Sequence, residues 1–172
     1  MIQVSRYCSP NGEKSIIKDV DGIKIGFVSY NQFNGAPLEQ QNTIDEIKKV
    51  KTATDLVIIF CHWGDEYQLK ENTNQETLAH QFVDAGADLV IGSHPHVIQP
   101  MEEYMGKRIY YSLGNFIFDQ YFNESVRNGL GVVVQIDKTT KKLDFSERHF
   151  YLQNNGQTLL TNGQAVEEIT EK

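Results

Sequence analysis

Three of the chain's five histidines lie in two short segments, and each segment directly follows an apolar run. His62 follows "LVIIFC", and His94 and His96 follow "LVIGS". Imidazole is a common ligand for zinc, manganese, iron and nickel, and three imidazoles are enough for an open catalytic site. The pattern therefore predicts that His62, His94 and His96 bind a divalent transition metal. The alternative is that they are loop histidines whose rings are satisfied by backbone carbonyls.

The local sequence "GSHPH" supports the metal interpretation. Gly92 and Ser93 keep the backbone free of bulk where an ion must approach, and Pro95 restricts His94 to extended conformations. Histidines at positions i and i+2 of an extended segment point to opposite sides. His94 and His96 are therefore expected to serve two adjacent metals, or a metal and a substrate.

Two weaker candidates for catalysis accompany the histidines. Glu66 follows His62 together with Asp65. One of the two is expected to orient a ligand, to be a ligand or to act as an acid/base group, or else both belong to a solvated acidic loop. Asn115, in "YYSLGNFIFDQ", either faces the same crevice or satisfies a buried turn through its own side chain. In this segment Phe116 and Phe118 are expected in the core, and Trp63 is expected to form a lid over the site.

The residues that must position these groups alternate between strand and helix patterns. Continuous apolar runs predict strands that are buried on both faces, and capping-box pairs predict the starts of the helices between them. The βαβαβ order predicts a parallel sheet, whose carboxyl ends bring the three histidines to one edge. The expected elements are a strand over 22–33 ending in a turn at Asn34-Gly35, a helix from the pair Thr43 and Glu46, a strand over 55–61, a helix from the pair Thr73 and Glu76 to Gly86, and a strand over 87–92.

Beyond Pro100 the pattern changes to antiparallel strands. Two short strands are expected around Met105-Gly106, followed by a longer hairpin that turns at 138–142. The predicted fold class is α/β, with βαβαβ followed by antiparallel strands. The predicted organisation is one domain over 1–155 and a polar, frayed tail over 156–172.

Composition excludes several classes of function. The 172 residues, 40% hydrophobic and 23% charged, suffice for one domain with its own core, and the net charge of -7 argues against nucleic acid as a partner. Cys8 and Cys61 are too few for a disulfide framework or a thiolate metal site, and are expected to be small buried residues. No run is long enough to span a membrane, and residues 1–14 contain no signal-peptide core, so a complete chain would be expected in the cytoplasm.

Three segments resemble the C-terminal half of the CapA family, the poly-γ-glutamate capsule synthesis proteins. They are "HWGDEY", "LAHQFVDAGADLVIGSHPHVIQPME" and "YYSLGNFIFDQ", in this order and spacing. The family resembles a branch of the calcineurin-like metallophosphoesterases, whose αββα sandwich carries a dinuclear metal centre. The resemblance runs from about Ile23 to about Val134. It implies that His62, His94 and His96 bind one or two ions of manganese, zinc or iron.

The resemblance also implies that motifs are missing. The superfamily's Gly-Asp and Asn-His motifs are not in this sequence, so the dinuclear centre is expected to be incomplete and the chain to be a fragment or a short relative. The expected function is a metal-dependent, phosphoesterase-like hydrolase domain of capsule biosynthesis at the cell envelope, acting on a phosphate ester or an anionic polymer. The alternative is a catalytically inactive module that binds metal or polymer. Missing strands would expose the sheet, so a homodimer is expected.

Overall fold

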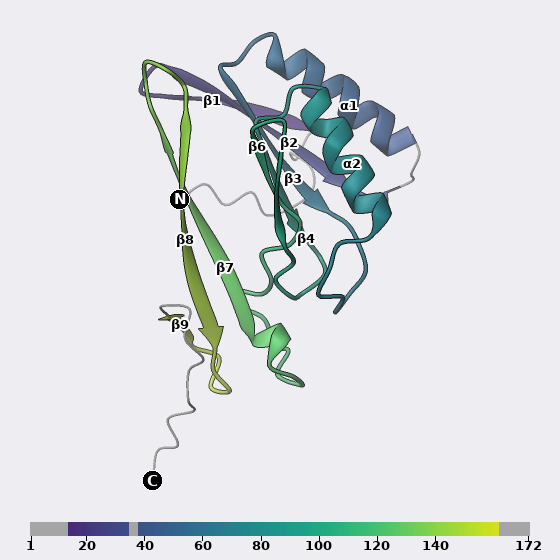
Figure 1. The fold of residues 1–172 in the computed structure, drawn as a ribbon, viewed down its shortest axis with the longest axis vertical. Helices are drawn as coiled ribbons and strands as arrows, with labels where there is room; N and C mark the ends of the chain where they lie inside the picture. Colours follow the sequence, from purple (N-terminus) through teal and green to yellow (C-terminus); the bar gives the residue numbers. More distant parts are fainter. Residues whose placement is uncertain (1–13, 35–37, 162–172) are drawn as a thin grey trace.

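The computed structural model describes residues 14–34 and 38–161, which form three layers. Two helices cover one face of a six-stranded sheet, and the β7–β8 hairpin (residues 128–152) of a three-stranded antiparallel sheet covers the other (Figure 1). The predicted α/β class, βαβαβ followed by antiparallel strands, is confirmed. The elements are β1 (Ser15–Val20), β2 (Ile23–Asn31), α1 (Leu38–Lys51), β3 (Leu56–His62), α2 (Thr73–Asp84), β4 (Leu89–Ser93), β5 (Met101–Tyr104), β6 (Lys107–Tyr110), β7 (Asn128–Ile136), β8 (Leu143–Leu152) and β9 (Thr158–Thr161).

The order of strands in the larger sheet, β1-β2-β3-β4-β6-β5, places the two histidine-bearing segments side by side. Strands β2, β3, β4 and β6 run parallel, and the register pairs His62 with Ser93. The carboxyl ends of β3 and β4 therefore meet at one edge, as the apolar runs predicted. These runs are continuous because both of their faces are covered, one by the helices and the other by the β7–β8 hairpin.

Helix α1 begins at Leu38, five residues before the predicted start at Thr43. Thr43 lies inside the helix, where its hydroxyl donates a hydrogen bond to the Glu39 carbonyl at 2.8 Å. Glu46 accepts a hydrogen bond from the Ser15 hydroxyl at 2.6 Å and so links the helix to β1. The prediction of a capping box at Thr43 and Glu46 was wrong, because mid-helix threonine can bond back to the preceding turn instead.

The prediction of a capping box at Thr73 and Glu76 was wrong, because the capping box of helix α2 lies one residue earlier. Asn72 is the N-cap: its side chain accepts from the Gln75 backbone amide, and its own amide donates to the Gln75 side chain. Thr73 is the first residue of the helix rather than its cap. The pairs 72/75 and 73/76 both fit the capping-box pattern, and the stronger N-cap, asparagine, prevails. At the other end Gly86 adopts a φ of 118°, as its predicted place after the helix requires.

Trp63 lies in the core on the helix side of the sheet and is fully buried. Its ring stacks on Phe82 and Tyr111, and its Nε1–H donates to the Tyr111 carbonyl at 2.9 Å. The prediction of Trp63 as a lid over the site was therefore wrong. Gly92 serves the same packing, because a Cβ there would clash with the Tyr111 carbonyl oxygen and lie 2.5 Å from the Trp63 Nε1. It makes room for the contact between Tyr111 and Trp63 in the core rather than for an ion.

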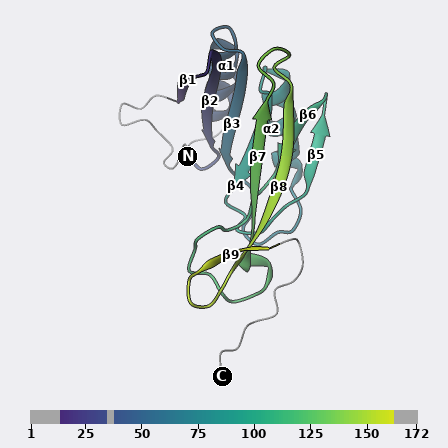
Figure 2. The same cartoon turned by 90° about the vertical axis from the view of Figure 1, so that its left-hand side faces the viewer.

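The β7–β8 hairpin lies across the other face of the large sheet (Figure 2). It turns at residues 137–142, which include the predicted turn at 138–142, and the β5–β6 turn falls at Met105 and Gly106 as predicted. The sequence did not predict β1 or β9. Strand β9 pairs with β8 inside the stretch expected to fray, because its four residues add to the free antiparallel edge of β8. Residues 162–172 of that predicted tail lie outside the described residues.

The structure also bears on the predicted turn after β2, on the two cysteines and on membrane-spanning helices. Asn34 closes a turn after β2, with its backbone amide donating to the Asn31 carbonyl, and its predicted partner Gly35 lies outside the described residues. Cys61 is buried, as expected, and Cys8 lies outside the described residues as well. Among the helices that the structure describes, none is both long and apolar enough to cross a membrane.

Candidate metal centre

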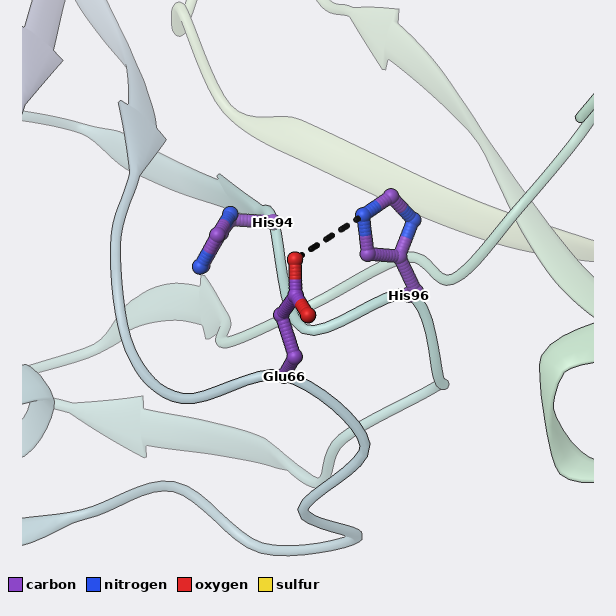
Figure 3. A group of neighbouring side chains, drawn as sticks. All are labelled: Glu66, His94 and His96. Carbon is purple, nitrogen blue, oxygen red and sulfur yellow. Dashed lines mark ion pairs between the residues drawn. The ribbon is translucent and has the colours of Figure 1, made fainter.

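The side chains of Glu66, His94 and His96 converge in front of the carboxyl ends of β3 and β4 (Figure 3). Each offers one ligand atom, and these atoms all lie within 4.8 Å of one another. The His96 Nε2 is 4.0 Å from a Glu66 carboxylate oxygen. Two imidazoles and one carboxylate are a donor set that divalent transition metals accept. We call these three residues the metal group.

The backbone of the loop that follows β4 directs the side chains of His94 and His96 toward one point. His94 has a φ of 100° and His96 a φ of 59°, in the left-handed region that favours glycine. The segment is therefore not extended, and the prediction that the two imidazoles point to opposite sides was wrong. The backbone of Tyr67 is also left-handed, and its N–H donates to the Pro95 carbonyl at 2.8 Å. This bond joins the loop after β3 to the loop after β4. Backbone strain of this kind is concentrated at functional sites.

His62 adjoins the metal group through His94. It is the last residue of β3, and its ring centroid is 4.6 Å from that of His94. Burial, with smaller contributions from His94 and His96, lowers the pKa of His62 to about 4, and burial also lowers the pKa of His94. Both imidazoles are therefore uncharged at neutral pH, with a lone pair on one nitrogen, as metal binding requires. The three predicted histidines form one cluster, although His62 is not in the metal group itself.

Asn115 determines which nitrogen of His96 faces the metal group. Its Nδ2 donates to the Val126 carbonyl at 2.9 Å, and this bond turns its Oδ1 toward the His96 Nδ1, also at 2.9 Å. An amide oxygen only accepts, so the His96 Nδ1 carries a proton, and in the neutral ring the Nε2 facing Glu66 keeps its lone pair. Both sequence interpretations of Asn115 therefore hold, because it satisfies a buried turn and also orients a histidine.

The acidic loop that follows His62 divides between two roles. Glu66 enters the metal group although its side chain is 48% exposed. Asp65 accepts a hydrogen bond from the Asn72 Nδ2 at 2.7 Å, beside the start of α2, and is not in the metal group. The structure thus places Glu66 as a candidate ligand, where the sequence left ligand, acid/base group and solvated loop open.

Sequence reasoning missed a rim of aromatic side chains around the histidines, formed by Phe33, Tyr67, Phe118 and Phe122. Phe33 is 4.7 Å from the His94 ring and Phe118 is 4.8 Å from the His96 ring, measured between centroids. Phe118 is 41% exposed and Phe116 is 55% exposed, so their prediction as core was wrong. They lie in a loop without strand or helix periodicity, where apolar residues give no signal of which way they face.

Residues 9–120 match the model of a family described as bacterial capsule synthesis protein PGA_cap. The match covers more than half of the chain and includes all of the candidate site residues. The chain belongs to this family. The relatives that it resembles in sequence include the PGA biosynthesis protein CapA of Bacillus subtilis, 36% identical over 127 residues, which are 66% of this chain and 33% of that protein. The capsule biosynthesis protein CapA of Bacillus anthracis is 45% identical over 94 residues, 55% of this chain and 23% of that protein.

The match therefore spans about a third or less of the length of these two relatives. A solved structure, a hypothetical protein from Thermus thermophilus, shares the fold with a TM-score of 0.58 at 15% identity. That likeness covers 84% of this chain and 65% of the Thermus protein. This likeness supports the fold alone, because one fold can carry many different chemistries.

Proposed function

We propose that this PGA_cap domain binds a divalent transition metal and acts as a phosphoesterase-like hydrolase in capsule biosynthesis. The observation that carries the proposal is the convergence of the Glu66, His94 and His96 ligand atoms within 4.8 Å at the carboxyl ends of two parallel strands. His62 is a further donor, for the same ion or for a second one. Manganese, zinc and iron suit such a set of imidazole and carboxylate ligands.

The chain's own residues would prepare the site for a metal in three ways. Burial keeps His62 and His94 uncharged, and the Asn115 oxygen holds the His96 Nδ1 proton so that Nε2 faces inward. Phe33 and Phe118 shield the imidazoles from part of the solvent. A bound divalent ion would supply Lewis-acid polarisation of a phosphoryl or carbonyl oxygen. The substrate that we propose is a phosphate ester or an anionic polymer such as poly-γ-glutamate, and the setting is the bacterial cell envelope.

A second candidate function is a catalytically inactive module that binds metal or polymer. Among the residues that the structure describes, the metal group contains a single carboxylate, Glu66. Hydrolysis with two metals uses a closely spaced pair of ions. One carboxylate and two imidazoles offer few ligands for two ions. This observation favours one ion and weaker chemistry, and the two candidates differ in whether the loaded domain turns over a substrate.

The first experiment measures metal content by elemental analysis after incubation with manganese or zinc. Wild-type protein is expected to hold the ion near stoichiometrically, and the double variant His94→Ala, His96→Ala is expected to lose it. His80→Ala is the matched control, because His80 lies outside the metal group and stacks on Tyr104. Metal retained equally by all three proteins would contradict the proposed site.

The metal-loaded protein is then assayed with phosphomonoester and phosphodiester model substrates. Hydrolysis that disappears in the double variant would support the hydrolase. Stoichiometric metal without turnover of either class would favour the inactive binding module.

A further inference from the structure

We infer that Gln99, with its buried partner Gln75, is a positioning residue that places Glu66 in the metal group. The inference rests on the proposed metal site and adds two residues that do not touch the metal group. They act through the loop over residues 64–72, called here the Glu66 loop. This loop leaves β3 and reaches the start of α2, and it contains Tyr67 as well as Glu66.

The two glutamines form a buried amide pair beneath this loop. Gln75 is fully buried and Gln99 is 3% exposed. The Gln75 Nε2 donates to the Gln99 Oε1 at 2.9 Å, and the Gln99 Nε2 donates to the carbonyls of Gln68 and Lys70, both at 3.0 Å. One amide group therefore holds the middle of the Glu66 loop at two points, two and four residues beyond Glu66.

Gln75 holds the two ends of the same loop. Its Oε1 accepts from the Asn72 backbone amide at 3.0 Å, which fixes the end of the loop at the cap of α2. At the beginning, Gly64 has a φ of 82° and packs directly on Gln75, where a Cβ would lie 2.6 Å from the Gln75 amide. The Gly64 amide also donates to the Gln32 side chain at 3.0 Å. The loop is thus held at its start, middle and end.

The acceptors that Gln99 uses, the carbonyls of Gln68 and Lys70, indicate that it does more than satisfy buried polar groups. Buried amides are nearly always hydrogen-bonded, so the bonds alone prove no function. However, Gln68 and Lys70 are exposed residues of a surface loop, and water could satisfy their carbonyls if the loop were not held against Gln99. Two buried amide side chains are therefore not needed to satisfy the loop. What they secure is its position.

Glu66 depends on that position because its own side chain has little to hold it. The side chain is 48% exposed, and it approaches His96 at 4.0 Å, longer than a hydrogen bond. A loosened backbone would let the carboxylate turn into solvent. Residues that orient metal ligands typically change metal affinity by about 10- to 100-fold when they are removed.

The test is a double-mutant cycle on manganese affinity, with the wild type, Glu66→Gln, Gln99→Met and the double variant measured by calorimetry. Each single variant is expected to weaken binding about tenfold. The double variant is expected to bind no more weakly than the weaker single variant, because Gln99 acts through Glu66. Effects that multiply, or unchanged affinity in Gln99→Met, would overturn the positioning role.

Two further measurements separate this role from general destabilisation. Thr43→Val is the matched control: it removes the hydroxyl of a buried residue in α1, away from the loop, and is expected to lower stability without changing manganese affinity. Hydrogen exchange of metal-free Gln99→Met is expected to be faster at the amides of residues 66–70 but unchanged in β4. Unchanged exchange in the Glu66 loop would also contradict the inference. Absence of manganese binding by the wild type would refute the proposed function, and hydrogen exchange would then decide the role of Gln99.

Discussion

At the scale of single residues, replacing Asn115 tests whether His96 must be held in one orientation in order to bind metal, and not merely be present. Asn115→Ala is expected to weaken manganese binding about tenfold, because the His96 ring loses the acceptor that keeps its proton on Nδ1. The affinity is measured by calorimetry, and the tautomer of metal-free His96 by nitrogen NMR at neutral pH. Asn155→Ala, at an exposed turn, is the matched control.

The NMR measurement gives this prediction a clear contrary outcome. In the wild type the His96 ring is expected to show one tautomer, and in Asn115→Ala a mixture of both. A single unchanged tautomer together with unchanged affinity would show that Asn115 serves only its buried turn, through the bond to the Val126 carbonyl.

The same scale shows what residue types alone can and cannot predict. The sequence predicted that the three histidines lie together, because imidazoles directly after neighbouring buried strands are typical of a ligand site. The structure brings them into one cluster. The directions in which the His94 and His96 side chains point were not predicted, because the left-handed backbone at these residues leaves no pattern in the residue types. Glu66 was left open because an acidic residue in a polar loop is usually solvated, and only the fold shows what it faces.

At the scale of elements, Asp88 joins α1, β3 and β6 just before β4. It is 5% exposed and accepts hydrogen bonds from Lys51 at 2.7 Å, from Lys107 at 2.8 Å and from the Val57 backbone amide at 2.9 Å. Burial alone would raise the pKa of Asp88, but these three donors lower it below its ordinary value of 3.8. The carboxylate therefore stabilises the fold in its charged form.

Asp88→Asn is expected to lower the free energy of unfolding at pH 7 by about 2 kcal/mol, since a charged hydrogen-bond acceptor is lost. The contribution of Asp88 is fully present above its ordinary pKa of 3.8 and is lost as the pH falls through the lower pKa of the folded state. Urea unfolding at pH 7 and below pH 3.8 measures both effects. The loss should be largest at pH 7 and should shrink in acid.

Asp45→Asn is the control for this stability measurement, because Asp45 lies on α1 and bonds locally to Gln41 at an exposed position. Its substitution is expected to change the free energy of unfolding by less than about 0.5 kcal/mol. An equal loss in the two variants would show that Asp88 acts through general charge rather than through its three donors.

The elements themselves were predicted better than their ends. Buried strands and helical stripes were found because burial imposes a period on apolar residues, as Ile47 and Val50 in α1 show. The helix starts were misplaced because Thr43 and Thr73 both fit a cap pattern, whereas Thr43 bonds back to Glu39 inside α1 and Asn72 is the N-cap of α2. Strand β1 was missed because an edge strand is mostly exposed and carries no continuous apolar run.

At the scale of the whole molecule, β1 is the end strand of the large sheet among the described residues, and it carries exposed apolar side chains. Ile16, Ile17 and Val20 are 37%, 47% and 45% exposed. An edge strand with such side chains is a template for pairing with another chain. The homodimer expected from the sequence is therefore proposed to form through β1, rather than through the opposite edge strand β5.

Light scattering and sedimentation at high concentration test this proposal. The wild type is expected to dimerise, and Ile17→Lys is expected to be monomeric, because a charge on an edge strand opposes pairing between copies. Met101→Lys, on the edge strand β5, is the matched control and is expected to leave the dimer intact. A monomeric wild type would refute self-association, whereas a dimer lost only in Met101→Lys would move the interface to β5. Because β2 separates β1 from the two strands that lead into the metal group, manganese affinity should be the same in the dimer and in the Ile17→Lys monomer.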